Sequence, residues 1–159
     1  MPVEIEKKFL VKGDSWRNLA TGSFYCQGYI SLAPERIVRV RTIEDKGFLT
    51  IKGVTKGFSR AEYEYEIPLH DANEMLDQLC ERPLIEKNRY KIEYKGLIWE
   101  VDDFLGDNQG LILAEVELIE ENQKIALPGW IGEEVTGNFR YCNASLVKYP
   151  FNQWPKGTG

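Results

Sequence analysis

The sequence contains little of the chemistry that disulfide scaffolds, zinc sites and histidine catalysis require. Its three cysteines, Cys26, Cys80 and Cys142, lie far apart, leave an odd count and form no C-x-x-C pair. Neither a disulfide framework nor a zinc site is therefore predicted, and a reducing, cytoplasmic location is expected. The single histidine, His70, follows Pro68 at a strand end and is interpreted as a turn residue rather than as a general base.

Long apolar segments and an excess of basic charge are also missing. The chain begins with a predicted strand instead of an apolar signal segment, and no later run is long enough to cross a bilayer, so no membrane association is expected. The formal net charge of −5 argues against a broad basic surface for nucleic acid. Residues 53–57 lack the spacing of a P-loop and are better explained by a hairpin turn. Any phosphate recognition must therefore be local and enclosed.

What the chain does contain is a succession of short alternating segments separated by proline or glycine. Strands are predicted over residues 2–11, 23–32, 36–44, 47–54, 60–68, 84–95, 97–104 and 111–120. Helices are predicted over 14–19, 71–79 and 144–148, with Asp71 capping the second and Met75, Leu76 and Leu79 forming its apolar side. Because no linker or repeat interrupts the pattern, we expect one mainly β (α+β) domain over 1–159.

Charged residues alternate with apolar ones in strand after strand. Glu4, Glu6 and Lys8 share one face of the first strand, and Val3, Ile5 and Phe9 share the other. The same parity links Arg39 with Arg41, Glu62 with Glu64 and Glu66, Lys87 with Arg89 and Lys91, Glu100 with Asp102, and Glu115 with Glu117, while Lys52 ends a further alternating run. A solvated sheet face is the commoner cause of such alternation in any one strand. Over so many strands, a closed barrel with a charged interior explains the mixture of both signs better.

A charged interior of this kind suits a polyphosphate held with its metal. Clustered carboxylates without histidine or cysteine ligands favour hard cations such as Mg²⁺ or Mn²⁺. Clustered arginine and lysine favour phosphate oxygens. Phosphoryl transfer depends mostly on positioning and charge neutralisation, so no nucleophilic side chain is required.

A series of motifs follows in a fixed order along nearly the whole chain. It opens with Glu4-x-Glu6-x-Lys8 followed by Phe9-Leu10-Val11, and it continues with Gln27-Gly28-Tyr29, Arg39-Val40-Arg41, Thr50-Ile51-Lys52, Arg60-x-Glu62-Tyr63-Glu64, Glu86-Lys87-x-Arg89-Tyr90, Glu100-Val101-Asp102, Glu115-Val116-Glu117 and Glu133-Glu134-Val135-Thr136. This series resembles the CYTH, or triphosphate tunnel metalloenzyme, superfamily, and is closest to its short bacterial members. The ordered charged pairs are much more specific than the opening motif alone.

The resemblance implies a closed antiparallel barrel of about eight strands with a few flanking helices, and a triphosphate bound inside. It implies metal ligation by Glu4, Glu6, Glu115 and Glu117, assisted by Asp102, Glu62 and Glu64. It implies phosphate binding by Lys8, Arg39, Arg41, Lys52, Lys87, Arg89 and Arg140. Glu4, Glu6, Lys8 and Glu117 would carry the catalytic roles, with a metal-activated water attacking the terminal phosphoryl group.

Two positions qualify this assignment. Short family members often carry a second basic residue after the Arg-Tyr pair near the C-terminus, whereas this chain continues Arg140-Tyr141-Cys142-Asn143. Loss of that charge would weaken the hold on the substrate or change which substrate is preferred. Tyr29 is expected to contact the substrate or to hydrogen-bond the motif lysine, although an aromatic residue in a strand often serves packing alone.

The leading prediction is a divalent-metal-dependent triphosphatase that acts on inorganic tripolyphosphate. A class IV-type adenylate cyclase, which converts ATP to cyclic AMP and pyrophosphate, is the second hypothesis, and a non-catalytic protein that binds polyphosphate or nucleotide is the third. All three need the same charged cage, but the sequence shows no motif for recognising a base. A homodimer that packs through an apolar outer wall is compatible with the sequence.

Overall fold

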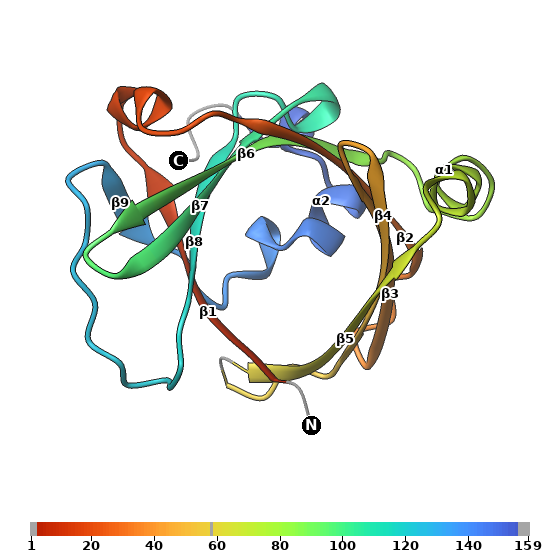
Figure 1. The fold of residues 1–159 in the computed structure, drawn as a ribbon, viewed down its shortest axis with the longest axis horizontal. Helices are drawn as coiled ribbons and strands as arrows, with labels where there is room; N and C mark the ends of the chain where they lie inside the picture. Colours follow the sequence, from red (N-terminus) through yellow and green to blue (C-terminus); the bar gives the residue numbers. More distant parts are fainter. Residues whose placement is uncertain (1–2, 58, 156–159) are drawn as a thin grey trace.

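The structure is a computed structural model that describes residues 3–57 and 59–155, without the side chains of Val3 and Glu4. Nine strands in this part of the chain form one sheet in the order β5-β4-β3-β2-β6-β7-β8-β1-β9. A further antiparallel pairing between β5 and β1 closes strands β1 to β8 into a ring (Figure 1). The prediction of a closed antiparallel barrel is therefore confirmed.

The strands follow the predicted segments closely. Their bounds are β1 Val3–Val11, β2 Ser23–Ser31, β3 Arg36–Ile43, β4 Lys46–Gly53, β5 Ser59–Ile67, β6 Ile85–Tyr94, β7 Leu97–Phe104, β8 Ile112–Glu117 and β9 Ile131–Glu134. The sequence does not predict β9, a four-residue strand that contains a glycine and pairs with β1 through an irregular register. Such a short strand has no room for a recognisable alternation.

Strand β1 has neighbours along both of its edges. Residues 3–5 pair with β5 on one edge, and β9 takes over on that edge opposite Phe9 and Val11. Residues 6–10 pair with β8 on the other edge. This arrangement fixes the backbone on both sides of Glu6 and Lys8, the two described charged residues of the opening motif.

Helical segments flank the barrel on its outside, as α1 (Leu69–Gln78) does, or enter its interior, as α2 (Asn143–Lys148) does (Figure 1). The 3-10 helices are η1 Ser15–Asn18, η2 Gly106–Asn108, η3 Phe139–Tyr141 and η4 Phe151–Gln153. None of the helices in the described residues combines the length and the apolar character that a membrane span needs.

Helix α1 packs on the outside of the barrel against β2, β3 and β4 (Figure 1). It begins at Leu69 after an extended Pro68, so Asp71 lies within the first turn and makes no capping hydrogen bond, contrary to the prediction. The helix buries Ala72 and Leu76 against Val40 of β3, whereas Leu79 is exposed. The predicted apolar side was therefore wrong at Leu79, because the helix ends one residue before it.

A hydrophobic core covers the outside of one half of the barrel. Phe9 of β1, Trp99 of β7 and Val116 of β8 alternate with the charged residues of their strands and are buried. Trp16 of η1 and Trp130, which precedes β9, belong to the same core, and the ring centroids of Trp99 and Trp130 lie 6.2 Å apart. The apolar strand faces thus point away from the lumen, which leaves the opposite faces to line it.

The lumen is apolar at one end. Ile85, Phe104 and Leu113 share the parity of the charged residues on β6, β7 and β8, yet they form a core with Leu146 of α2 and with Trp154. Figure 1 shows α2 within the ring. The C-terminal segment therefore fills this part of the barrel, and the expected charged interior is confined to the remainder.

Candidate active site

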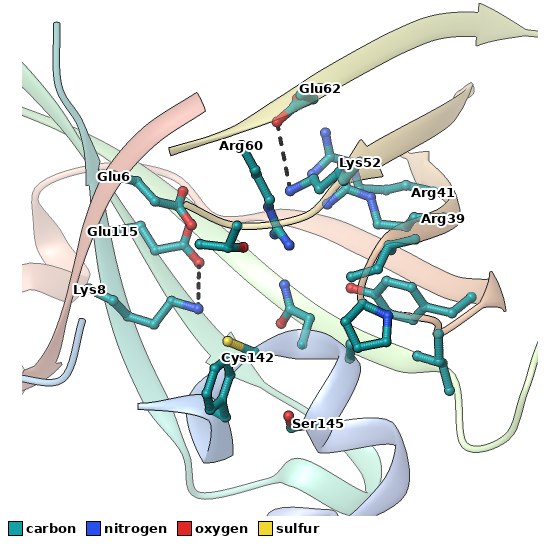
Figure 2. Close-up of a pocket in the computed structure, with 18 of the residues that line it drawn as sticks. Glu6, Lys8, Arg39, Arg41, Lys52, Arg60, Glu62, Glu115, Cys142 and Ser145 are labelled. Atoms are coloured by element: carbon teal, nitrogen blue, oxygen red, sulfur yellow. Dashed lines mark ion pairs between the residues drawn. The ribbon is translucent and has the colours of Figure 1, made fainter. Parts of the chain in front are cut away.

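A cavity of about 520 Å³ occupies the remaining part of the lumen (Figure 2). Each of the eight barrel strands contributes at least one polar or charged side chain to its wall, and α2 contributes from the filled end. The predicted site residues that line it are Glu6, Lys8, Tyr29, Arg39, Arg41, Lys52, Glu62, Glu64, Arg89, Glu115 and Glu117. Residues separated by more than a hundred positions in the chain thus face one another across a single space.

One wall of the cavity, formed by β1 and β8, is mainly acidic. The strand register places Glu6 opposite Glu117 and Lys8 opposite Glu115. Lys8 Nζ lies 3.8 Å from Glu115 Oε1 and donates a hydrogen bond to the Tyr141 carbonyl oxygen at 3.2 Å. Glu6 lies beside Glu115 in Figure 2. The wall therefore offers several carboxylate oxygens around one fixed ammonium group.

The charges of this wall hold one another in the ionised form. Burial disfavours the Glu115 carboxylate, but nearby Lys8, Arg89 and Lys87 outweigh it and keep the pKa of Glu115 below its usual range. Burial likewise opposes the charge on Lys8, yet Glu115 and Glu6 raise its pKa above the ordinary value. At neutral pH Glu115 therefore stays negative and Lys8 stays positive.

The facing wall, formed by β3, β4 and β5, is mainly basic and is organised by one carboxylate oxygen. Glu64 Oε1 lies 3.4 Å from Arg39 Nη2 and 3.1 Å from Arg41 Nη2, and it accepts a hydrogen bond from Thr50 Oγ1 at 2.8 Å. Lys52 Nζ lies 3.7 Å from Glu62 Oε2. The Nε atoms of Arg39 and Arg41 are buried and have no hydrogen-bond partner among the described groups. Both arginines line the cavity, so their positive charges face a ligand even though these Nε atoms are enclosed.

Arg41 is held among like charges. Burial and the neighbouring Arg39 and Arg89 lower the pKa of Arg41 to about 10, against the opposing effect of Glu64. Tyr25 of β2 lies between two of these cations, with its ring centroid 5.4 Å from Arg41 Cζ and 5.1 Å from Arg89 Cζ. An anion entering the cavity would relieve this repulsion, so the wall favours phosphate electrostatically.

A buried charge group lies beside the cavity, on the lumen faces of β6 and β7. Asp102 accepts hydrogen bonds from Lys87 Nζ at 2.8 Å and from Arg89 Nε at 2.7 Å and Nη2 at 2.8 Å. Arg89 also donates to Glu100 Oε2 at 3.2 Å and reaches the cavity, whereas Lys87 and Asp102 do not line it. Burial and the adjacent Arg89 lower the pKa of Lys87 to about 8.

Two further predicted site residues lie elsewhere. Arg140 does not line the cavity, and its Cζ lies 4.0 Å from the centroid of the Trp154 ring. Glu4 pairs with Arg60 through its backbone, but its side chain lies outside the described residues. Tyr29 lines the cavity, and its hydroxyl oxygen accepts a hydrogen bond from Gln27 Nε2 at 3.1 Å.

The structure adds lining residues to which the sequence assigned no role. Arg60 and Glu100 share the parity of Glu62 and Asp102 on their strands, so strand alternation alone could have identified them. Ser145 and Lys148 come from α2, where strand parity carries no information. Cys142 lies at the edge of the same helix and faces the cavity (Figure 2).

The donor set fits a hard divalent cation. Glu6, Glu115 and Glu117 supply carboxylate oxygens along one wall, and Glu62 and Glu64 supply them on the other. Histidine is absent from the lining, and Cys142 is its single sulfur donor, which favours Mg²⁺ or Mn²⁺ over softer metals. Among the described residues, no cluster of three or more carboxylate, histidine or cysteine groups is already close enough to hold an ion. Phosphate oxygens would thus have to complete the coordination.

Comparison with known proteins agrees with this arrangement. The sequence matches the model of the CYTH domain over residues 2–149. A protein named inorganic triphosphatase from Acetivibrio thermocellus is 55% identical over 154 residues, which cover 97% of this chain and 99% of that protein. Another inorganic triphosphatase, from Nitrosomonas europaea, is 36% identical over 152 residues and covers 91% and 96% of the two chains.

Solved structures share the fold. The crystal structure of the inorganic triphosphatase NE1496 superposes with a TM-score of 0.66 at 34% identity, covering 90% of this chain and 96% of that one. The PH1012 protein of Pyrococcus horikoshii has a TM-score of 0.57 at 22% identity and covers 75% and 80% of the two chains, which supports the fold alone.

Proposed function

The chain belongs to the CYTH domain family, and from this premise we propose that it is a divalent-metal-dependent triphosphatase that hydrolyses inorganic tripolyphosphate. The observation that carries the proposal is the convergence of a basic and an acidic wall on one cavity. A triphosphate needs many cationic donors at once, and its metal needs oxygen ligands on the other side. The names of the two curated relatives point to the same substrate class.

We propose that the cations of the lining bind the phosphate oxygens. Arg39 and Arg41 suit this role because both line the cavity and lie among like charges that an anion would offset. Lys8, Lys52 and Arg89 reach the same space from three other strands. Lys87 and Asp102 would act indirectly, because neither lines the cavity. Asp102 would fix the Arg89 guanidinium, and Lys87 would hold Asp102. Arg140 would support the filled end of the barrel through its contact with Trp154.

The metal assignment follows the acidic wall. We propose that Glu6, Glu115 and Glu117 hold Mg²⁺ or Mn²⁺ together with Glu4, and that Glu62 and Glu64 assist while they orient the basic wall. When bound, the ion would neutralise phosphate charge and activate the attacking water. The cavity would hold the tripolyphosphate in an extended form, with the attacking water in line with the bond to be cleaved. Water would then attack the terminal phosphorus, the bond to the bridging oxygen would break and pyrophosphate would leave.

The proposed setting is a small-molecule reaction in the cytoplasm, without nucleic acid or membrane. Cys26, Cys80 and Cys142 are free thiols, which suits a reducing compartment. The functional unit would comprise residues 1–159 as a single domain. Homodimer formation stays a prediction, and light scattering on the purified chain measures it directly.

The decisive experiment measures phosphate release from tripolyphosphate, ATP and pyrophosphate, each with Mg²⁺, with Mn²⁺ and with a chelator. We expect orthophosphate and pyrophosphate in equal amounts from tripolyphosphate, only when a metal is present. Cyclic AMP formed from ATP would support the cyclase hypothesis instead. Tight binding of tripolyphosphate without turnover under any metal would indicate the non-catalytic protein.

A further inference from the structure

Gln27 is a polar side chain inside the barrel that the assignments above leave without a role. It lies on the lumen face of β2, is fully buried and donates through Nε2 to the Tyr29 hydroxyl oxygen at 3.1 Å. Its own Oε1 has no hydrogen-bond partner among the described groups. A buried amide that makes a single side-chain hydrogen bond calls for an explanation, because unpaired polar atoms cost stability.

The surroundings determine which end of the amide faces Tyr29. The strand register places Gln27 opposite Arg41, next to the pairing of Tyr29 with Arg39. A carbonyl oxygen is favoured beside these cations, so the amide nitrogen is the end that is left for Tyr29. Gln27 therefore acts as a donor, and the Tyr29 oxygen acts as its acceptor.

The Tyr29 hydroxyl is thereby left with its hydrogen to donate. The groups that act on it electrostatically are Arg39, Arg60 and Lys8, which come from three other strands, and none of them can accept a hydrogen bond. Burial raises the pKa of Tyr29, so the hydroxyl keeps its hydrogen at neutral pH. Tyr29 also lines the cavity. A neutral donor surrounded by cations is matched by an incoming anion.

We propose that Gln27 is a positioning residue that makes the Tyr29 hydroxyl donate its hydrogen to a phosphate oxygen of the substrate. The inference rests on the proposed function for the identity of that substrate. Without the Gln27 amide, the hydroxyl would rotate freely and would have no fixed direction. With the amide in place, the hydrogen points into the lumen before the phosphate arrives, which removes an ordering cost from binding and catalysis.

A double-mutant cycle tests this coupling. Gln27→Met keeps the volume and removes the donor, Tyr29→Phe removes only the hydroxyl, and Gln123→Met is a matched exchange in the loop after β8. We expect Gln27→Met to lower kcat/KM for tripolyphosphate about tenfold, as the loss of one hydrogen bond predicts. In the Tyr29→Phe background the same exchange should change kcat/KM less than about twofold. Equal losses in both backgrounds would mean that Gln27 serves packing alone.

Gln27→Glu tests whether the direction of the hydrogen bond to Tyr29 matters, apart from the packing of the side chain. Glutamate has nearly the volume of glutamine but offers acceptors, so it would take the Tyr29 hydrogen away from the lumen. We expect a loss at least as large as that of Gln27→Met, and again little further loss when Tyr29→Phe is present. Wild-type activity in Gln27→Glu would overturn the proposal.

A readout without turnover distinguishes this inference from the proposed function. In protein labelled with ¹³C at tyrosine Cζ, the Tyr29 resonance is identified by its absence in Tyr29→Phe. Tripolyphosphate added with a chelator should shift that resonance in the wild type and shift it less in Gln27→Met. A shift in a protein that releases no phosphate from tripolyphosphate with either Mg²⁺ or Mn²⁺ would reject the triphosphatase but keep the Tyr29 contact. An unmoved resonance in an active enzyme would reject the contact and keep the triphosphatase.

Discussion

Lys87 Nζ lies 2.8 Å from Asp102 Oδ2, and both side chains are closed off from solvent and from the cavity. Asp102 also takes both hydrogen bonds from one side of the Arg89 guanidinium. One carboxylate thus contacts two buried cations, of which only Arg89 lines the cavity. The charge that a substrate meets at this wall depends on a group that it never touches.

Removal of that carboxylate charge should destabilise the protein. Asp102→Asn removes the carboxylate that pairs with buried Lys87 and leaves Arg89 with Glu100 alone, so we expect the free energy of unfolding to fall by about 3–5 kcal/mol. Urea denaturation at pH 7 measures the loss. Asp103→Asn is the matched control, because its partner Arg17 is partly exposed and the pair should contribute less than about 1 kcal/mol. Similar stability for both variants would contradict the role of Asp102.

The lowered pKa of Lys87 predicts an alkaline dependence of stability. Its value of about 8 in the folded protein lies below the 10.5 of an ordinary lysine, so between these values the unfolded chain binds more protons. The contribution of Lys87 to the free energy of unfolding should therefore rise with pH over this window, by at most about 1.4 kcal/mol per pH unit.

Urea denaturation at pH 7.5, 8.5 and 9.5 compares the wild type with Lys87→Met, in which this rise should be missing. Lys8→Met is the control, since the pKa of Lys8 is raised and its charge is constant over the same range. An identical pH slope in the wild type and in Lys87→Met would show that Lys87 does not titrate there.

The acidic wall should be required for metal-dependent turnover but not for folding. Glu117 lines the cavity and is exposed, so Glu117→Gln should leave the melting temperature within a few degrees of the wild type. Phosphate release from tripolyphosphate should fall at least about 100-fold, because loss of one metal ligand weakens charge stabilisation. Glu4→Gln is expected to behave in the same way. Full turnover of both variants at saturating Mg²⁺ would show that the metal assignment is wrong.

The basic wall should act mainly on substrate binding. Arg41→Ala removes a guanidinium that lines the cavity and lies over Tyr25, and we expect KM for tripolyphosphate to rise about 10- to 100-fold. Arg36→Ala is the control on the same strand, since Arg36 lies on the opposite face and is exposed. Initial rates at varied substrate give both constants. An unchanged KM with a reduced kcat would contradict the role of Arg41 in binding.

Strand alternation was sufficient to predict most of the fold and which residues share the lumen face. It worked because the barrel reverses the usual burial, with Phe9 and Trp99 packed outside and the charged residues inside. It failed at β9, a four-residue strand that pairs with the part of the β1 edge to which β5 does not extend. The pairing of that strand depends on the geometry of β1 and not on its own pattern.

Depth along the barrel could not be read from the sequence. Ile85, Lys87 and Arg89 share one parity on β6, yet Ile85 packs against the C-terminal segment, Lys87 is buried without lining the cavity and only Arg89 reaches it. Parity identifies the face of a strand but not the level at which another segment fills the lumen. Strand parity likewise could not predict Lys148, because it lies on α2 and reaches the cavity from inside the barrel.

The apolar packing of Leu146 and Trp154 fills one end of the barrel and so limits the routes by which a ligand could reach the cavity. If a phosphate chain binds in the cavity as proposed, it would have to enter and its products would have to leave by a route other than this filled end. A longer linear polyphosphate would leave its tail in solvent instead of threading through. The protein would then shorten such a chain from its tip, one encounter at a time.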